Sequence, residues 1–159
     1  MFDDFSSGLN TVIWNVNART ISGTGVNDNP FIYVDSLCTV HIDSVERLQL
    51  SMINYPNYTT TDWLNNPISA NYITGGIISR QHFSYGIFEC NAQFAHNLGS
   101  FPAFWLMSAE QCSLSYNNEI DIVECKVQSV NNIKLQNNLF YWPVCDDRHS
   151  YYFNDESNI

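Results

Sequence analysis

The stretch Glu119-Ile120-Asp121-Ile122-Val123-Glu124 decides the fold class, because it sets three carboxylates on one short β-prone segment. Alternate side chains of a strand lie on opposite faces, so Glu119 and Asp121 share one face and the two isoleucines share the other. Strict alternation would then turn Glu124 toward the apolar face. An extra, bulged residue at Val123 returns Glu124 to the polar face, and β-bulges are over-represented beside active sites.

The residues that follow the hexapeptide support this bulge. With Val123 as the inserted residue, Glu124 and Lys126 share the polar face. Cys125 and Val127 then share the apolar face. Three acids along one face repel each other, which is unfavourable as plain structure. We therefore predict a bulged antiparallel strand that carries all three carboxylates on one face.

The spacing of the outer two acids indicates a chemistry. Allowing for the bulge, Glu119 and Glu124 lie four strand steps apart, or roughly 13 Å between Cα atoms at ~3.3 Å per step. Side chains that lean toward one point bring these carboxyl groups to about 5–6 Å, near the separation in retaining glycosidases. Asp121 between them would push the pKa values of its neighbours apart. A solvated acidic face and a calcium site are the alternatives that this pattern leaves open.

Several segments resemble glycoside hydrolase family 16, the family of the laminarinases, lichenases, agarases and carrageenases. The bulged Glu-x-Asp-x-x-Glu stretch resembles its active-site strand, in the form typical of β-1,3-glucanases and marine galactanases. Four further segments resemble family motifs in the family's order: Phe2–Phe5, Thr74–Ser79, Tyr85–Glu89 and Gly99–Met107. The resemblance runs from near residue 1 to about Pro143.

The resemblance implies an all-β fold, an antiparallel jelly-roll sandwich of the concanavalin A-like type. Carried over by position, it implies Glu119 as the nucleophile and Glu124 as the general acid/base. It also implies that Asp121 is the carboxylate that assists between them. The side chains that it implies for binding sugars are Trp105, Phe101 and Trp142.

Two positions depart from the family pattern. Phe101 stands where the family usually has Trp, which keeps an aromatic platform but alters a subsite. Phe140 replaces the His of the family's Asn-Leu-His-Tyr-Trp strand, which Asn138–Trp142 otherwise resembles. That His faces the catalytic carboxylates in many members. A slower enzyme, or a relative that binds glycans without cleaving them, is therefore an expectation beside full activity.

Composition limits the partners. The chain has 16 Asp and Glu against 6 Lys and Arg, a formal net charge of −10, and no basic run, which argues against nucleic acid and anionic membranes. The same acidity favours a neutral glucan over a strongly sulfated polysaccharide. Together with the resemblance, this implies hydrolysis of internal β-1,3 or mixed β-1,3/1,4 linkages. An agarase-like galactanase of the same family is the alternative enzyme. No apolar run reaches the ~18 residues of a membrane span.

Length bears on the domain organisation. We expect a single domain over residues 1–159 that acts as a monomer if complete, but only 35 residues follow Glu124. Since all-β domains often take ~200–250 residues, we expect the family's C-terminal strands to be lacking, and a non-functional fragment is a further alternative. The first residues show no basic and apolar signal-peptide pattern. The resemblance nevertheless implies secretion.

Short β-prone runs separated by turn residues predict an all-β chain without helices. The run Tyr85–Phe94 alternates cleanly, which predicts a strand with Phe88 and Cys90 toward a core. Asn54–Pro67 is predicted as a long loop that contains Trp63, and Cys145–Ile159 as a frayed tail. The other predicted strands are Thr11–Val16, Phe31–Val34, Cys38–Ile42, Arg47–Met52, Tyr72–Ser79, Ala103–Met107, Glu119–Val127 and Asn138–Trp142.

The odd count and wide spacing of the five cysteines argue against zinc and redox motifs. Cys90 and Cys125 are predicted to be small buried apolar side chains, whereas Cys112 and Cys145 flank the acidic strand and are candidates for a disulfide. The four histidines lack metal-binding spacing, so we expect no cofactor. Candidate ligands for a structural calcium ion are Asp3 and Asp4.

Overall fold

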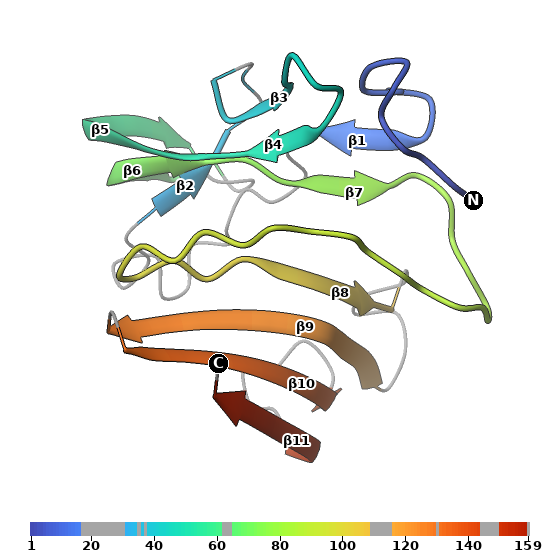
Figure 1. The fold of residues 1–159 in the computed structure, drawn as a ribbon. Coiled ribbons are helices and arrows are strands. Elements are labelled where there is room, and N and C mark those ends of the chain that lie inside the picture. The colour runs from blue at the N-terminus through green and yellow to red at the C-terminus, as the bar shows by residue number, and fades with distance from the viewer. Residues whose placement is uncertain are drawn as a thin grey trace. The chain divides into compact units, whose positions relative to one another are not determined.

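A computed structural model of the protein describes residues 1–16, 31–34, 36, 38–61, 65–108, 116–129, 131–143 and 150–158. At 116–117, 141–143 and 150–158 it describes the backbone alone. Over these residues the regular secondary structure consists of β-strands, joined by turns and loops, which confirms the predicted all-β fold class (Figure 1). Within the same residues, no helix is long and apolar enough to span a membrane. The chain divides into two compact units, Met1–Phe83 and Ser84–Ile159.

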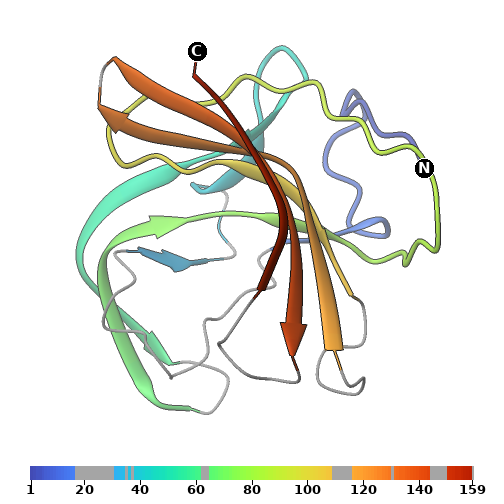
Figure 2. The ribbon, with the colours of Figure 1, turned by 90° about the horizontal axis from the view of Figure 1, so that it is seen from below.

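The first unit contains three small sheets. Two of them are antiparallel pairs, β1 with β7 and β3 with β4, and the third has the order β2-β6-β5. The long strands β5 and β6 pair antiparallel and curve together (Figure 2), whereas β2 pairs with β6 in parallel. The strands are β1 (Trp14–Val16), β2 (Phe31–Tyr33), β3 (Val40–Ile42), β4 (Leu48–Leu50), β5 (Met52–Thr61), β6 (Pro67–Thr74) and β7 (Ile77–Ser79).

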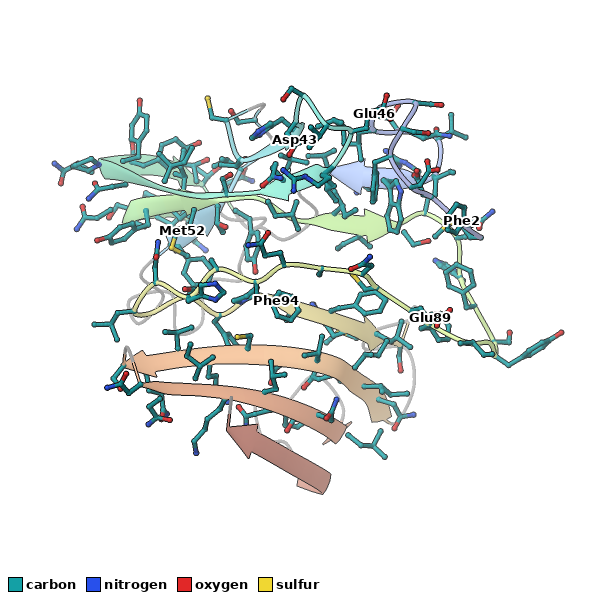
Figure 3. All side chains as sticks on the ribbon, in the orientation of Figure 1. Phe2, Asp43, Glu46, Met52, Glu89 and Phe94 are labelled. Atoms are coloured by element: carbon teal, nitrogen blue, oxygen red, sulfur yellow. The ribbon has the colours of Figure 1, made fainter. Side chains whose placement is uncertain are left out.

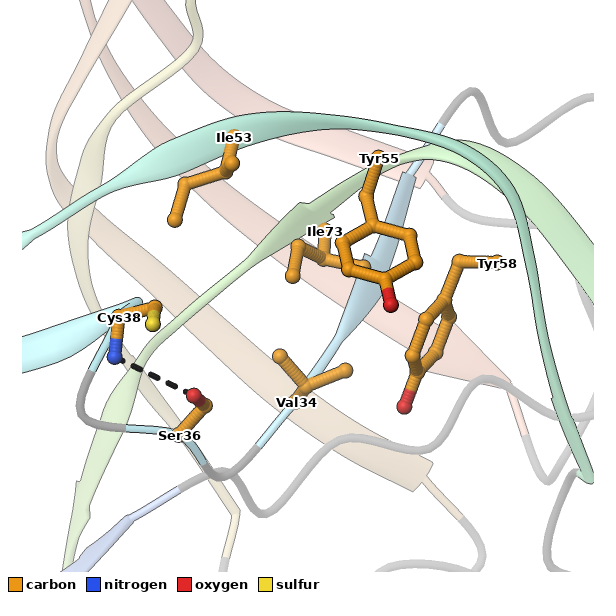
Figure 4. Close-up of a pocket in the computed structure, with 7 residues that line it drawn as sticks. All are labelled: Val34, Ser36, Cys38, Ile53, Tyr55, Tyr58 and Ile73. Carbon is orange, nitrogen blue, oxygen red and sulfur yellow. Dashed lines mark hydrogen bonds between the residues drawn. The ribbon is translucent and has the colours of Figure 1, made fainter.

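Branched apolar side chains form the core of this unit. Ile32, Val34, Ile68 and Ile73 are buried together, as expected when alternate residues of neighbouring strands turn toward one face. A pocket of about 270 Å³ lies beside this core (Figure 4). None of the residues that line it is acidic or basic. Its lining residues are Val34, Ser36, Cys38, Ile53, Tyr55, Tyr58 and Ile73.

The connection between β3 and β4 is a tight acidic turn, in which Figure 3 labels Asp43 and Glu46. The Asp43 carboxylate accepts hydrogen bonds from the backbone N–H groups of Val45 and Arg47, and from the side chains of Arg47 and Gln49. The backbone hydrogen bond from Arg47 is the main reason why the pKa of Asp43 is lowered to about 2. This carboxylate therefore stays charged and holds the turn at ordinary pH.

The second unit contains one four-stranded antiparallel sheet with the order β11-β10-β9-β8 (Figure 1). Strand β8 spans Ala103–Met107, with the predicted bounds. Strand β9 spans Tyr116–Ser129 and strand β10 spans Asn132–Pro143, so the predicted segments lie inside longer strands. Strand β11 spans Ser150–Asn158. The prediction of a frayed, strandless tail is therefore wrong, because the polar sequence of β11 is held by its ladder to β10.

Two further segments differ from the prediction. Tyr85–Phe94 forms no strand, with Ile87 90% exposed and Cys90 exposed. Alternation shows which face a strand would bury, but it does not supply the neighbouring strand that a ladder needs. The predicted loop Asn54–Pro67 is largely the end of β5, with a register shift between Asn54 and Tyr58. Outside the described residues lie Trp63, Cys112 and Cys145.

The turn between β6 and β7 passes very close to β3. A Cβ atom added at Gly75 would lie 2.6 Å from the backbone oxygen of Thr39 and 2.4 Å from a methyl carbon of Val40. Thr39 is fully buried, and its carbonyl oxygen accepts the N–H of Ser51. The backbone there has little room to shift. At the neighbouring Gly76, the nearest atom to an added Cβ is a Tyr33 ring carbon at 3.5 Å.

We predict that Gly75→Ala destabilises the protein by about 1–3 kcal/mol, the usual penalty for forcing an extra carbon into a filled space. Gly76→Ala is the matched control and should change the free energy of unfolding by less than about 0.5 kcal/mol. Urea unfolding followed by circular dichroism measures both. Equal effects of the two substitutions would contradict the close approach at Gly75.

Candidate active site

The three acids lie on β9, between β8 and β10, and each has a directly opposite residue on both neighbours. Residues that pair directly across antiparallel strands place their side chains on the same face. The carboxylates therefore share a face with three residues of β8 and three of β10. The resulting rows are Met107–Glu119–Phe140, Trp105–Asp121–Asn138 and Ala103–Glu124–Gln136.

The predicted bulge in β9 is confirmed by the register on both sides. On the β8 side, Phe104 pairs with Val123 and Trp105 with Asp121, so β9 advances two residues while β8 advances one. The register also shifts on the β10 side, between Gln136 and Asn138. Across β8 the extra residue is Ile122 rather than the predicted Val123. The bulge is thus one position earlier, and the face of each acid is unchanged.

Side-chain burial agrees with this register at Cys125 and Val127, but not at Ile120, which shares their face and is 44% exposed. Cys125 is 1% exposed and Val127 is 4% exposed, as predicted for the apolar face. The side-chain amide of Asn137 donates a hydrogen bond to the carbonyl oxygen of Ile122. Because a bulge disrupts the ladder locally, this contact gives a partner to a carbonyl group at the inserted residue.

The register also fixes the spacing of the outer acids. Glu119 faces Met107 and Phe140, whereas Glu124 faces Ala103 and Gln136. On each neighbouring strand these partners are four residues apart, which corresponds to roughly 13 Å along the sheet. This is the Cα spacing predicted from the bulged sequence.

Asn138 connects two of the acids. Its side-chain nitrogen donates one hydrogen bond of 2.9 Å to Asp121 Oδ2 and another of 2.7 Å to Glu124 Oε2. Asp121 and Asn138 are each only 3% exposed, and buried polar groups are generally paired in this way. The structure therefore brings Asp121 and Glu124 to a common donor. Asn138 was not among the site residues predicted from the sequence. It lies two residues before Phe140 on the same predicted strand, so alternation places both side chains on one face.

The pKa of the Glu124 carboxyl is raised above its usual value. Burial is the main cause, and the negative charge of Asp121 adds to it. The positive charge of Lys126 and the hydrogen bond from Asn138 act in the opposite direction and are weaker together. Glu124 therefore keeps its proton to higher pH than an exposed glutamate, which is the property that a general acid needs.

Aromatic side chains continue the same face. Trp105 is partly buried and lies directly opposite Asp121. Phe101 is 45% exposed, and the Lys126 ammonium lies 5.2 Å from its ring centroid, a cation–π distance. Trp142 belongs to β10 and pairs with Asn117, and its side chain is outside the described part. Phe101 and Trp105 thus border the acids from the β8 side.

Phe140 stands at the position where the family resemblance implies His. It is 8% exposed and lies directly opposite Glu119. An apolar ring cannot donate a hydrogen bond or carry a positive charge there. Glu119 therefore has a phenyl ring, and not an imidazole, at its facing position on β10.

The candidate calcium ligands have other partners. Asp3 accepts hydrogen bonds from the backbone N–H of Phe5 and from the indole N–H of Trp14, at 2.9 and 2.8 Å. Asp4 accepts hydrogen bonds from Ser6. Among the residues whose placement is described, no group of three or more acidic, His or Cys side chains is arranged to hold a metal ion.

Carboxyl groups on one face of an antiparallel sheet, one of them with a raised pKa, and aromatic side chains beside them are the groups that glycoside hydrolases use. A family model supports this class and narrows it. The model described as "Glycosyl hydrolases family 16" matches residues 31–158, and the chain belongs to that family. The observed all-β structure with several antiparallel sheets is consistent with the family's jelly-roll sandwich.

Comparison with individual proteins adds no closer relative. No significant match was found among curated proteins or among solved structures.

The electrostatics of Glu124 can be tested by two substitutions with opposite effects. We expect Asp121→Asn to lower the pKa of Glu124, because it removes a negative charge beside it. We expect Lys126→Met to raise that pKa, because it removes a positive charge. Carbon-13 NMR titration of the Glu124 carboxyl measures both shifts.

Lys134→Met is the matched control for this titration. Lys134 lies on β10, directly opposite Lys126, and so on the strand next to that of Glu124. Loss of its charge should therefore shift the pKa of Glu124 less than loss of the Lys126 charge. Shifts of the same sign in Asp121→Asn and Lys126→Met would contradict the assignment of causes, as would a larger shift in Lys134→Met.

Proposed function

We propose that this protein hydrolyses internal β-1,3 or mixed β-1,3/1,4 linkages of a glucan with retention of anomeric configuration. In this proposal Glu119 is the nucleophile, Glu124 is the general acid/base and Asp121 assists between them. The observation that carries the proposal is the raised pKa of Glu124 on the sheet face that it shares with Glu119, four strand steps away. Two such carboxyl groups provide the acid and the nucleophile of a retaining glycosidase.

The first chemical step forms a covalent intermediate. A carboxylate oxygen of Glu119 attacks the anomeric carbon of the bound sugar while the glycosidic C–O bond breaks. The proton of Glu124 passes to the departing oxygen, so the leaving sugar departs as a neutral alcohol. Glu119 is then esterified and Glu124 is charged. The negative charge of Asp121 beside Glu124 favours the protonated form that begins this step.

The second step releases the sugar. Glu124, now a carboxylate, takes a proton from a water molecule as that water attacks the anomeric carbon. The ester bond to Glu119 breaks, which restores its carboxylate and leaves Glu124 protonated for the next cycle. Two inversions at one carbon give net retention.

The same face offers contacts for several sugar units. We infer that Trp105 contacts the sugar at the cleavage point, and that Phe101 and Trp142 contact its neighbours, because aromatic rings combine a large apolar surface with defined geometry. The strongly acidic composition supports a neutral glucan over a strongly sulfated chain. Action outside the cell is part of this proposal, since a polysaccharide of this kind is met there.

Removing each glutamate in turn tests the two roles. On laminarin, lichenan and agarose, we expect the unmodified protein to release reducing sugar from the two glucans. Glu119→Ala and Glu124→Ala should each lower that release about 10³-fold or more, because residues that act as a unit lose nearly all catalysis together. Reducing-sugar release and NMR of the first anomer formed provide the measurements.

Azide, added with a dinitrophenyl β-oligoglucoside as the substrate, distinguishes the nucleophile from the general acid/base. Dinitrophenolate departs without protonation, so the first step does not need the acid. In Glu119→Ala, azide attacks the anomeric carbon directly and should give the α-glycosyl azide. In Glu124→Ala, azide displaces the esterified Glu119 and should give the β-glycosyl azide. Exchanged products would reverse the two assignments.

One observation favours a second function, glycan binding without turnover. The apolar Phe140 faces Glu119 and gives it no hydrogen-bond donor at that position. A binding protein would retain laminarin or lichenan in affinity electrophoresis with no release of reducing sugar. Agarose cleavage with neither glucan cleaved would instead support the galactanase alternative.

A further inference from the structure

The side-chain nitrogen of Asn138 donates hydrogen bonds to two of the three acids, Asp121 and Glu124. We propose that Asn138 is a positioning residue, whose side-chain nitrogen holds Asp121 and Glu124 at a fixed separation while Glu124 gains and loses its proton. This inference rests on the proposed function for the catalytic cycle. The hydrogen-bonding geometry itself does not depend on it.

The chemistry of the amide group suits this role. A charged carboxylate only accepts hydrogen bonds, and the amide nitrogen of Asn carries two protons to donate. One proton can therefore point at each carboxyl group. Unlike an imidazole, a side-chain amide has no ionisation in the ordinary pH range. Asn138 is thus a donor with the same charge at every stage of the cycle.

The side-chain nitrogen of Asn138 reaches acids in two neighbouring rows of the sheet. Asn138 lies directly opposite Asp121, whereas Glu124 lies opposite Gln136, in the next row. The donor–acceptor distance to Glu124 is nevertheless the shorter of the two, at 2.7 Å against 2.9 Å. Burial of Asn138 to 3% exposure restricts its rotation. The neighbouring bulge, supported by Asn137, turns Glu124 onto this face.

The donor matters most when both acids are charged. After Glu124 has given up its proton, it and Asp121 are two anions that share a partly buried site, where repulsion is stronger than in water. Hydrogen bonds from one shared nitrogen oppose that repulsion and keep the carboxylates from turning apart. A misplacement near 1 Å can lower a catalysed rate about 100-fold. Positioning by Asn138 therefore affects the second step most directly.

Other charged side chains lie on the same face as Glu124, and a test of Asn138 must leave them unchanged. On β9 these are Glu119, Asp121 and Lys126, and on β10 the charged residue opposite Lys126 is Lys134. The β8 residues in the three rows have no ionisable side chain. Substitution of Asn138 alone leaves all of these groups in place.

The experiment compares Asn138→Ala and Asn138→Asp with the unmodified full chain. Asn138→Asp keeps the shape of the side chain and removes the donors, so it also serves if the alanine variant folds poorly. We expect both variants to move the Glu124 titration in carbon-13 NMR to higher pH, with the larger shift in Asn138→Asp because it adds a negative charge. We expect kcat to fall about 100-fold with a smaller change in KM, and the alkaline limb of the kcat profile to follow the titration.

Asn132→Ala is the matched control. Asn132 also lies on β10, and its side-chain amide donates a hydrogen bond of 3.1 Å to Gln128, away from the acids. It should leave the Glu124 titration and kcat unchanged. If these asparagines had a structural role only, the Asn138 and Asn132 variants would both lower the thermal stability of the protein. The Glu124 titration would then stay in place in all of them.

The two proposals fail in different ways. If the Glu124 titration does not move in either Asn138 variant, the positioning role is overturned, whatever happens to the rate. If the unmodified chain cleaves none of the three polysaccharides but the titration moves as expected, the positioning of the two carboxyl groups is supported. The proposed hydrolysis would then be the part that fails.

Discussion

The inserted residue in β9 is the constraint on which the site depends. Without it, the two-residue repeat of the strand would turn Glu124 away from Glu119 and Asp121. With it, three acids face one direction, and Cys125 and Val127 remain buried on the other face. The outer acids gain a spacing set by both neighbouring strands. A local irregularity of one residue thus determines which side chains of β9 share each face on the two sides of it.

The electrostatics follow from that arrangement. Burial and the charge of Asp121 raise the proton affinity of Glu124, whereas Lys126 and Asn138 lower it. Lys126 also contacts the ring of Phe101, so one side chain links an aromatic surface to the charge balance of the acids. Neighbouring side chains therefore determine in which direction the pKa of Glu124 moves.

Local sequence predicted the parts of this structure that depend on one strand at a time. The bulge was predictable because Lys126 and Val127 restore the alternation beyond it, and Ala103–Met107 because it is a short apolar run between turn residues. Properties that depend on a neighbouring strand were not predictable. Asn138 meets Asp121 only through the cross-strand register, and the polar strand β11 forms only through its ladder to β10. Tyr85–Phe94 has the alternation but no ladder.

The parallel pairing of β2 with β6 has a consequence for how the first unit folds. Thr61 and Pro67 pair across a short connection, so the β5–β6 hairpin can form from local contacts alone. Phe31 must find Tyr72, which is much farther along the chain, and closing the longer loop loses more conformational entropy. Non-local pairing of this kind is slow. Strand β2 is thus expected to join after the hairpin, and the core around Ile32 and Val34 forms only when it does.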